Sequence, residues 1–298
     1  MLITFWSPYH GQSGTTSNAI SMAVNMALNY DLKVLLTHSK YTKSNMEYAF
    51  DNENGSNSLK FDDTGIDSVS RLVKVNKLEK DDFKNYTKTL IHNRLELLSG
   101  SKKLYKESYE DVDINFINIL KCAKKAYDTV IVDVNSGICD KCTNKVLNES
   151  DIVVININQN EILIKDLFSN EKWKSILEKK NKILLLGKYD KNSKCTYNYV
   201  ERTYKYRDKI YTVPYSSDFM DACNNHNVIK FFKANVSNIS NKENCSFMLE
   251  LDKLSERLID MMELEKEKDV IKNTTFTESI KGIFKRKGGY DKQWTSGI

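Results

Sequence analysis

The sequence predicts an α/β fold: a mostly parallel, doubly wound sheet with helices on both faces. Two observations predict it. Short apolar runs rich in β-branched residues alternate with longer segments whose apolar residues recur at helical spacing. The first such unit, at residues 1–28, joins its strand to its helix through a loop with two glycines. Right-handed crossovers between parallel strands bring the loops that follow the strands to one edge of the sheet, where ligands bind.

The composition is that of a globular protein. Of 298 residues, 40% are hydrophobic and 29% charged, and only two are prolines, which suits a sizeable core without a proline-rich linker. No apolar run approaches the roughly 20 residues that a bilayer span needs, and no signal peptide is visible. We interpret the single C-x-x-C pair, Cys139 and Cys142, as incidental thiols rather than a metal or redox site. We expect a cytoplasmic protein with one domain at 1–265 and a tail at 266–298.

The loop of the first unit has the residues of a phosphate-binding loop. An apolar strand ends at Ser7, and apolar residues at helical spacing begin at Ala19. Such a loop places successive backbone N–H groups and a helix N-terminus around an anion. The predicted nucleotide-binding residues are His10, Gly11, Gln12, Ser13, Gly14, Thr15, Thr16 and Ser17.

A second motif is an apolar run, residues 127–134, that closes on Asp133. Such a run is typical of a central parallel strand, which delivers a carboxylate to the carboxyl edge of the sheet. We therefore expect Asp133 to lie at the same edge of the sheet as the loop of the first unit. The alternative is that Asp133 ends the strand without contacting any ligand.

The loop and the apolar run resemble the deviant Walker A and Walker B motifs of the ParA/MinD ATPases, including their TadZ and CpaE-like branch. Residues 10–16 are similar to KGGxGK[ST], and residues 127–137 are similar to YDxVIIDxxxG. The resemblance covers roughly residues 1–235. It implies ATP and Mg²⁺ as cofactors, with Thr16 and Asp133 at the metal and Asp133 as the catalytic carboxylate.

The sequence departs from the family pattern at several positions. His10 and Thr15 replace the two loop lysines, His38 and Lys40 replace acidic residues after the second strand, and Gly187-Lys188 replaces an adenine-contacting asparagine. One lost charge-assisted phosphate contact lowers affinity about ten- to a hundredfold. A missing cation costs phosphoryl transfer about 10³ to 10⁵ in rate. We therefore expect ATP binding in the micromolar range or weaker, and slow hydrolysis or none.

The tail has an amphipathic, basic pattern that resembles the membrane-targeting helix of MinD. Residues 272–298 contain six basic and two acidic residues, so +4 of the net charge of +5 lies there. Attraction of each base to anionic lipid is worth about 1 kcal/mol. A packed final helix and a disordered basic tail are the alternatives. The predicted membrane residues are Phe276, Ile280, Lys281, Ile283, Phe284, Lys285, Arg286 and Lys287.

Together these features predict a ParA/MinD-like nucleotide-binding switch or scaffold with weak or absent ATPase activity. The resemblance implies a homodimer, peripheral at the inner face of the cell membrane, that positions a pilus, secretion or conjugation machine. One alternative is an adaptor that retains the fold without binding nucleotide. Another is a DNA-partitioning ATPase, which the nearly neutral charge outside the tail disfavours.

Overall fold

The computed structural model describes residues 1–40, 44–50, 64–75, 77–101, 110–179, 181–236 and 241–262. Strands and helices alternate along them, as predicted. The strands are β1 (Leu2–Trp6), β2 (Val34–His38), β3 (Lys88–Ile91), β4 (Leu95–Leu98), β5 (Thr129–Asp133), β6 (Ile152–Ile157), β7 (Lys182–Tyr189) and β8 (Ile210–Pro214). The α-helices are α1 (Thr15–Asn29), α2 (Asn45–Tyr48), α3 (Ile66–Lys74), α4 (Phe83–Tyr86), α5 (Glu110–Ala126), α6 (Lys141–Glu149), α7 (Glu161–Ser169), α8 (Lys174–Leu177), α9 (Tyr197–Tyr204), α10 (Ser217–Asn224), α11 (Val228–Asn235) and α12 (Lys242–Met261). Two 3₁₀ turns, η1 (Lys80–Asp82) and η3 (Glu171–Trp173), precede α4 and α8.

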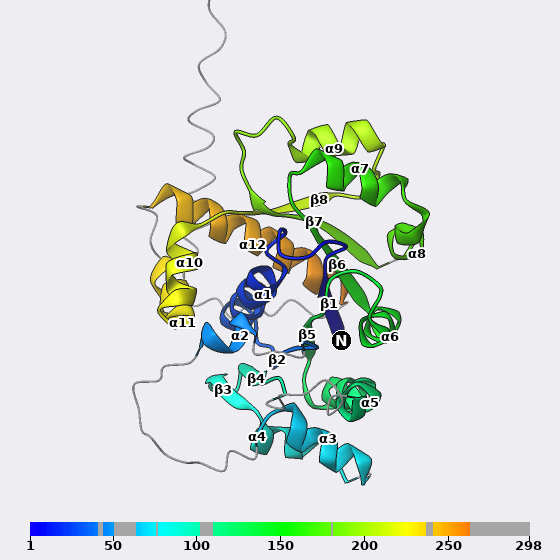
Figure 1. Cartoon of the computed structure of the whole chain (residues 1–298). Helices are drawn as coiled ribbons and strands as arrows, with labels where there is room; N and C mark the ends of the chain where they lie inside the picture. The colour runs from blue at the N-terminus through cyan, green and yellow to red at the C-terminus, as the bar shows by residue number, and fades with distance from the viewer. Residues whose placement is uncertain are drawn as a thin grey trace, which may run out of the picture.

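All eight strands form one sheet in the order β3-β4-β2-β5-β1-β6-β7-β8 (Figure 1). Every neighbouring pair is parallel except β3 and β4 at one edge. The mostly parallel α/β fold predicted from the sequence is therefore confirmed. The sequence did not predict the antiparallel strand β3, because Lys88–Ile91 is short, begins with two exposed residues and has no buried apolar run.

The sheet separates two apolar cores. Ile3 and Phe5 of β1 face one core, with α1 and α10–α12, whereas Leu2 and Trp6 face the other, with α3 and α5–α9. Because successive side chains of a strand point to opposite faces, a strand buried on both faces must be apolar throughout. This explains the apolar runs that predicted β1 and β5, and the similar run of β6.

The last described helix, α12, packs on the domain with its apolar side chains toward the core. It begins at Lys242, because the Asn241 side chain caps it by accepting from the N–H groups of Glu243 and Asn244. Leu251, Leu254 and Leu258 are fully buried in the core with α1. The predicted membrane residues between 276 and 287 lie outside the described residues. None of the described helices has the length and apolar character to cross a membrane.

A candidate phosphate site at the carboxyl edge of the sheet

The loop between β1 and α1 has the backbone that a phosphate-binding loop requires. Gly11 and Gly14 have φ of 74° and 69°, the left-handed region that favours glycine. Gly14 precedes the first turn of α1 and no side chain caps that turn. Ser13 is buried, whereas His10, Gly11, Gln12 and Ser17 are exposed and residues 14–16 are half-buried. An uncapped helix N-terminus at an open loop suits an anion, because its first N–H groups lack helical partners.

The two motifs predicted to meet do meet. The Thr16 hydroxyl donates a 2.6 Å hydrogen bond to Asp133 Oδ2, across 117 positions of the chain. The Asp133 side chain is fully buried at the end of β5, which lies beside β1. Gly137, with φ of 77°, turns the following segment back onto the loop, where its N–H donates to Ser7 O at 2.9 Å. The Asp133 carboxylate therefore contacts the loop of the first unit through Thr16.

The Lys40 ammonium also contacts both Thr16 and Asp133, and the sequence did not predict this contact. Its Nζ lies 2.7 Å from Asp133 Oδ2 and 2.5 Å from Thr16 Oγ1, and its side chain is 29% exposed. The register of the strands explains this contact, because His38, the last residue of β2, pairs with Asp133 of neighbouring β5. A long side chain two residues beyond His38 can therefore reach Asp133.

Both ring nitrogens of His38 contact other groups of the protein. Its Nε2 pairs with Glu47 Oε1 at 2.6 Å, and its Nδ1 accepts from the Lys40 N–H at 3.1 Å. Burial raises the pKa of Glu47, but hydrogen bonds from His38 and from the Gly100 N–H outweigh it and hold that pKa below its ordinary value. His38 thus fixes the backbone of Lys40 between α2 and the loop.

We tested whether Thr16 and Asp133 fit the magnesium ion that the resemblance implies. A hydroxyl and a carboxylate are suitable ligands, and Asp133 Oδ1 is buried without a hydrogen-bond partner among the described residues. However, the Lys40 ammonium already contacts Thr16 Oγ1 and Asp133 Oδ2. An Mg²⁺ bonded to both oxygens at about 2.1 Å would lie within about 4 Å of the ammonium, where two cations repel. The residues do not fit magnesium while Lys40 holds this position.

A pocket of about 530 Å³ extends from the loop between the ends of β7 and β8 and the helices α10 and α12. Gly14 and Thr16 form part of its wall, and Val213, Phe219 and Phe247 supply apolar surface. Lys188 also lines it, with its side chain against the loop. The volume lies within the range of small-molecule sites. The periodicity of the sequence did not reveal this pocket, because its walls come from five separate segments.

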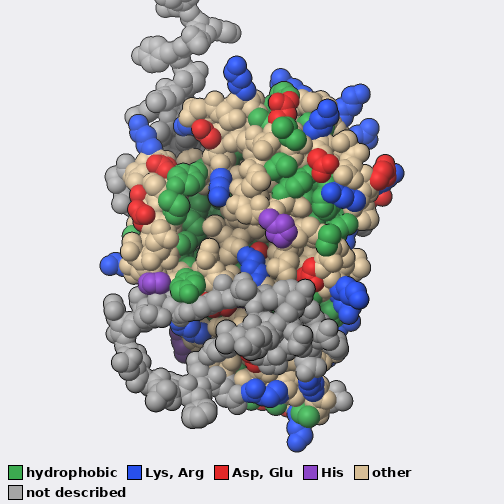
Figure 2. All heavy atoms as spheres, viewed as in Figure 1, with side chains coloured by type: hydrophobic (Ala, Val, Ile, Leu, Met, Phe, Trp, Pro, Cys, Tyr) green, Lys and Arg blue, Asp and Glu red, His purple; other side chains and the backbone are tan. Residues whose placement is uncertain are grey.

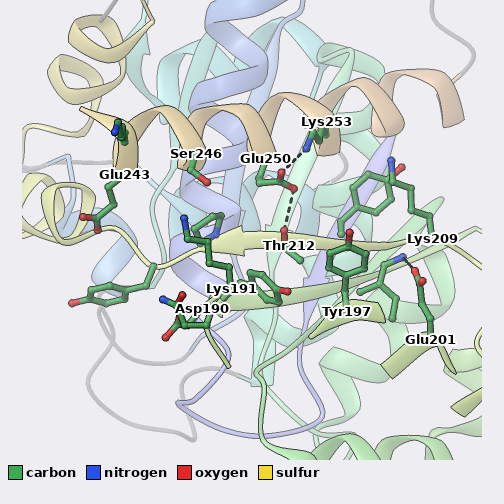
Figure 3. Close-up of a pocket in the computed structure, with 17 residues that line it drawn as sticks. Asp190, Lys191, Tyr197, Glu201, Lys209, Thr212, Glu243, Ser246, Glu250 and Lys253 are labelled. Carbon is green, nitrogen blue, oxygen red and sulfur yellow. Dashed lines mark hydrogen bonds and ion pairs between the residues drawn. The ribbon is translucent and has the colours of Figure 1, made fainter. Parts of the chain in front are cut away.

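A larger cavity, about 1,100 Å³, lies on the outer side of β8 (Figure 3). Glu250 of α12 accepts from the Thr212 hydroxyl at 3.0 Å and pairs with Lys253 at 2.5 Å, as the dashed lines show. None of the predicted site residues lines this cavity. We therefore assign the candidate site to the smaller pocket that adjoins the loop.

Tyr9 anchors the start of the loop to α7. Its hydroxyl lies 2.5 Å from Asp166 Oδ2 and 3.1 Å from Leu163 O, and its ring packs edge-on against Trp173. The hydrogen bond from Tyr9, followed by those from Asn170 and Trp173, lowers the pKa of Asp166 to about 2. The ionised form of Asp166 therefore stabilises the folded chain.

Replacing Tyr9 by phenylalanine is expected to lower the free energy of unfolding by about 1 kcal/mol at neutral pH, because one hydrogen bond to a charged group is lost. The stabilisation by Asp166 is present above its ordinary pKa near 4 and is lost as the pH falls from about 4 to about 2. Tyr9→Phe should therefore lose less stability than the wild type over this pH interval. Urea unfolding at several pH values measures this, and parallel acid profiles would contradict it.

A strand, a glycine loop and a helix N-terminus lie at the carboxyl edge of a doubly wound parallel sheet, beside a carboxylate from the neighbouring strand. Comparison with solved structures shows that the chain has the ParA/MinD-like fold.

Three of the similar structures illustrate the likeness. A ParA family ATPase from Chlorobium tepidum TLS is 17% identical and has a TM-score of 0.64, over 83% of this chain and 98% of that one. The septum site-determining protein MinD from Pyrococcus horikoshii OT3, complexed with Mg-ADP, is 14% identical with a TM-score of 0.61, over 88% and 99%. MinD in the MinC:MinD complex of Aquifex aeolicus is 16% identical with a TM-score of 0.59, over 90% and 99%. No family model and no curated protein matches the sequence.

Proposed function

We propose that the chain is a ParA/MinD-like switch or scaffold that binds ATP at the loop between β1 and α1. The observation that carries the proposal is the contact of Thr16 with Asp133, which joins the loop to β5 beside an uncapped helix N-terminus. The adjoining pocket of about 530 Å³ provides space and apolar walls for the base and ribose. The Pyrococcus MinD, which has the same fold, is complexed with Mg-ADP.

The same site supports slow hydrolysis or none. Phosphoryl transfer depends on positioned positive charge and on a group that orients the attacking water. Neither loop lysine is present, and both ring nitrogens of His38 are engaged with Glu47 and Lys40. The Lys40 ammonium pairs with Asp133. The protein is therefore proposed to act through the bound state rather than through rapid turnover.

Calorimetric titration with ATP tests the binding. The wild type is expected to bind saturably, in the micromolar range or weaker. Gly14→Val is expected not to bind, because Gly14 has φ of 69°, which valine rarely adopts, so the loop backbone must change. Circular dichroism of the variant checks that it folds. Absence of heat up to millimolar ATP would contradict the proposal.

We propose that ATP promotes a homodimer at the face that carries this pocket. Three large side chains that line the pocket, Tyr48, Tyr215 and Met220, are 45 to 46% exposed. Figure 2 shows one group of hydrophobic side chains on the left of this view, near α10 in Figure 1, and another group on the upper right. MinD of Aquifex aeolicus forms a complex with another protein, MinC. Light scattering with and without ATP tests the dimer, and a single mass under both conditions would contradict it.

The tail at 266–298 is proposed to hold the dimer at an anionic membrane surface, where the machine to be positioned is a pilus, secretion or conjugation assembly. Replacing Lys281, Lys285, Arg286 and Lys287 by glutamate is expected to abolish binding to vesicles with anionic lipid, since each base contributes about 1 kcal/mol. Co-sedimentation with vesicles measures this. Unchanged binding of the variant, or binding of the wild type to neutral vesicles, would contradict the proposal.

The second candidate is an adaptor that does not bind nucleotide. The observation that favours it is the contact of Lys40 with Thr16 and Asp133, which pairs the buried carboxylate without any ligand. The ATP titration separates the two candidates. A DNA-partitioning role is less favoured, because basic and acidic side chains are interspersed on the face shown in Figure 2.

A further inference from the structure

The position between Thr16 and Asp133, at the mouth of the phosphate loop, already holds a cation. The Lys40 ammonium lies 2.5 Å from the Thr16 hydroxyl oxygen and 2.7 Å from Asp133 Oδ2. Thr16 and Asp133 are the two residues that the resemblance assigns to magnesium. Their oxygens therefore already contact a positive charge of the chain itself.

We infer that Lys40 is the resident cation of this site, and that the loop binds the polyphosphate of its ligand without a magnesium ion. The inference rests on the proposed ATP binding and specifies its chemistry. The charge of the fully buried Asp133 is balanced by one ammonium. A lysine ammonium has three N–H donors. Two are directed to Thr16 and Asp133, which leaves one for a phosphate oxygen beside the loop.

Hydrogen bonds hold both the backbone N–H and the side-chain ammonium of Lys40 in this position. Its N–H donates to His38 Nδ1 at 3.1 Å, and the other ring nitrogen of His38 pairs with buried Glu47. Glu47 in turn accepts from the Gly100 N–H at 2.8 Å and from the Ser44 N–H at 3.1 Å. The backbone of Lys40 is therefore fixed by a hydrogen-bonded chain that reaches α2 and the end of β4. A lysine that is only 29% exposed and bonded at both ends is pre-organised for its contact.

Calorimetric titration of the full chain tests the inference, with ATP and with tripolyphosphate, each in EDTA and in excess Mg²⁺. Affinity is expected to agree within about threefold between the two conditions, because the metal has no vacant position. Binding that requires Mg²⁺ would overturn the inference and leave the proposed ATP binding intact. Binding of tripolyphosphate but not of ATP would support the inference and contradict the proposed function. Binding of neither, in either condition, would overturn both.

The variant Lys40→Met separates the role of the ammonium from that of the loop. In EDTA it is expected to bind ATP about ten- to a hundredfold more weakly than the wild type, which corresponds to one charge-assisted contact. Excess Mg²⁺ should restore much of this loss, because the oxygens of Thr16 and Asp133 become available to the metal. The matched control is Lys165→Met, since Lys165 of α7 is an exposed lysine that does not line the pocket. The titration of the wild type decides the inference if the Lys40 variant does not fold.

Discussion

Replacing Gly187 by alanine is expected to destabilise the chain by about 3 kcal/mol or more, at the upper end of the cost of overpacking. A Cβ at this position would lie 2.0 Å from the Ser13 carbonyl oxygen and 2.8 Å from Asn18 Nδ2. The first is a backbone atom of the phosphate loop, so the loop or β7 must move. Thermal unfolding should show a midpoint lower by about 6 to 12 °C.

Gly11→Ala is the matched control for this prediction. A Cβ at Gly11 meets nothing within 4 Å, but the residue has φ of 74°. Alanine there should cost only about 1 kcal/mol, the penalty of the left-handed conformation. A Gly187 variant as stable as the Gly11 variant would show that the loop does not approach β7 as described. Loss of ATP binding in Gly187→Ala, measured below its unfolding temperature, would further locate the ligand at this loop.

Replacing Lys40 by methionine is expected to lower the free energy of unfolding by about 3 kcal/mol in the absence of ligand. The variant leaves the carboxylate of Asp133 fully buried without its cation. Breaking a buried ion pair from one side typically costs about 3 to 5 kcal/mol, and the lower end applies because Lys40 is 29% exposed. Urea unfolding at neutral pH measures the loss.

A double-mutant cycle with Asp133→Asn distinguishes the lost ion pair from lost packing of the lysine. In the Asp133→Asn background no buried charge remains, so Lys40→Met should cost less than about 1 kcal/mol. Lys188→Met, at an exposed position, should change stability by no more than about 0.5 kcal/mol. Equal costs of Lys40→Met in both backgrounds would contradict the pairing with Asp133.

Much of the fold could be predicted from the sequence because its signal is local. A strand buried on both faces needs an apolar residue at every position, as in Val130, Ile131 and Val132 of β5. The order of such runs and intervening helices defines a parallel sheet. The antiparallel strand β3 and the half-exposed helices α6 and α9 lack such runs, so they were not predicted.

The sequence by itself also determined the centre of the site. Gly11 and Gly14 are glycines because the loop takes positive φ, and Thr16 and Asp133 meet because parallel strands end at one edge. The tertiary structure alone decided what fills that edge. The Lys40 ammonium reaches Asp133 because β2 lies beside β5 in the sheet. The Gly187 backbone lies against Ser13 because only one strand, β6, lies between β7 and β1. These contacts depend on distances between strands remote in sequence, which local patterns do not encode.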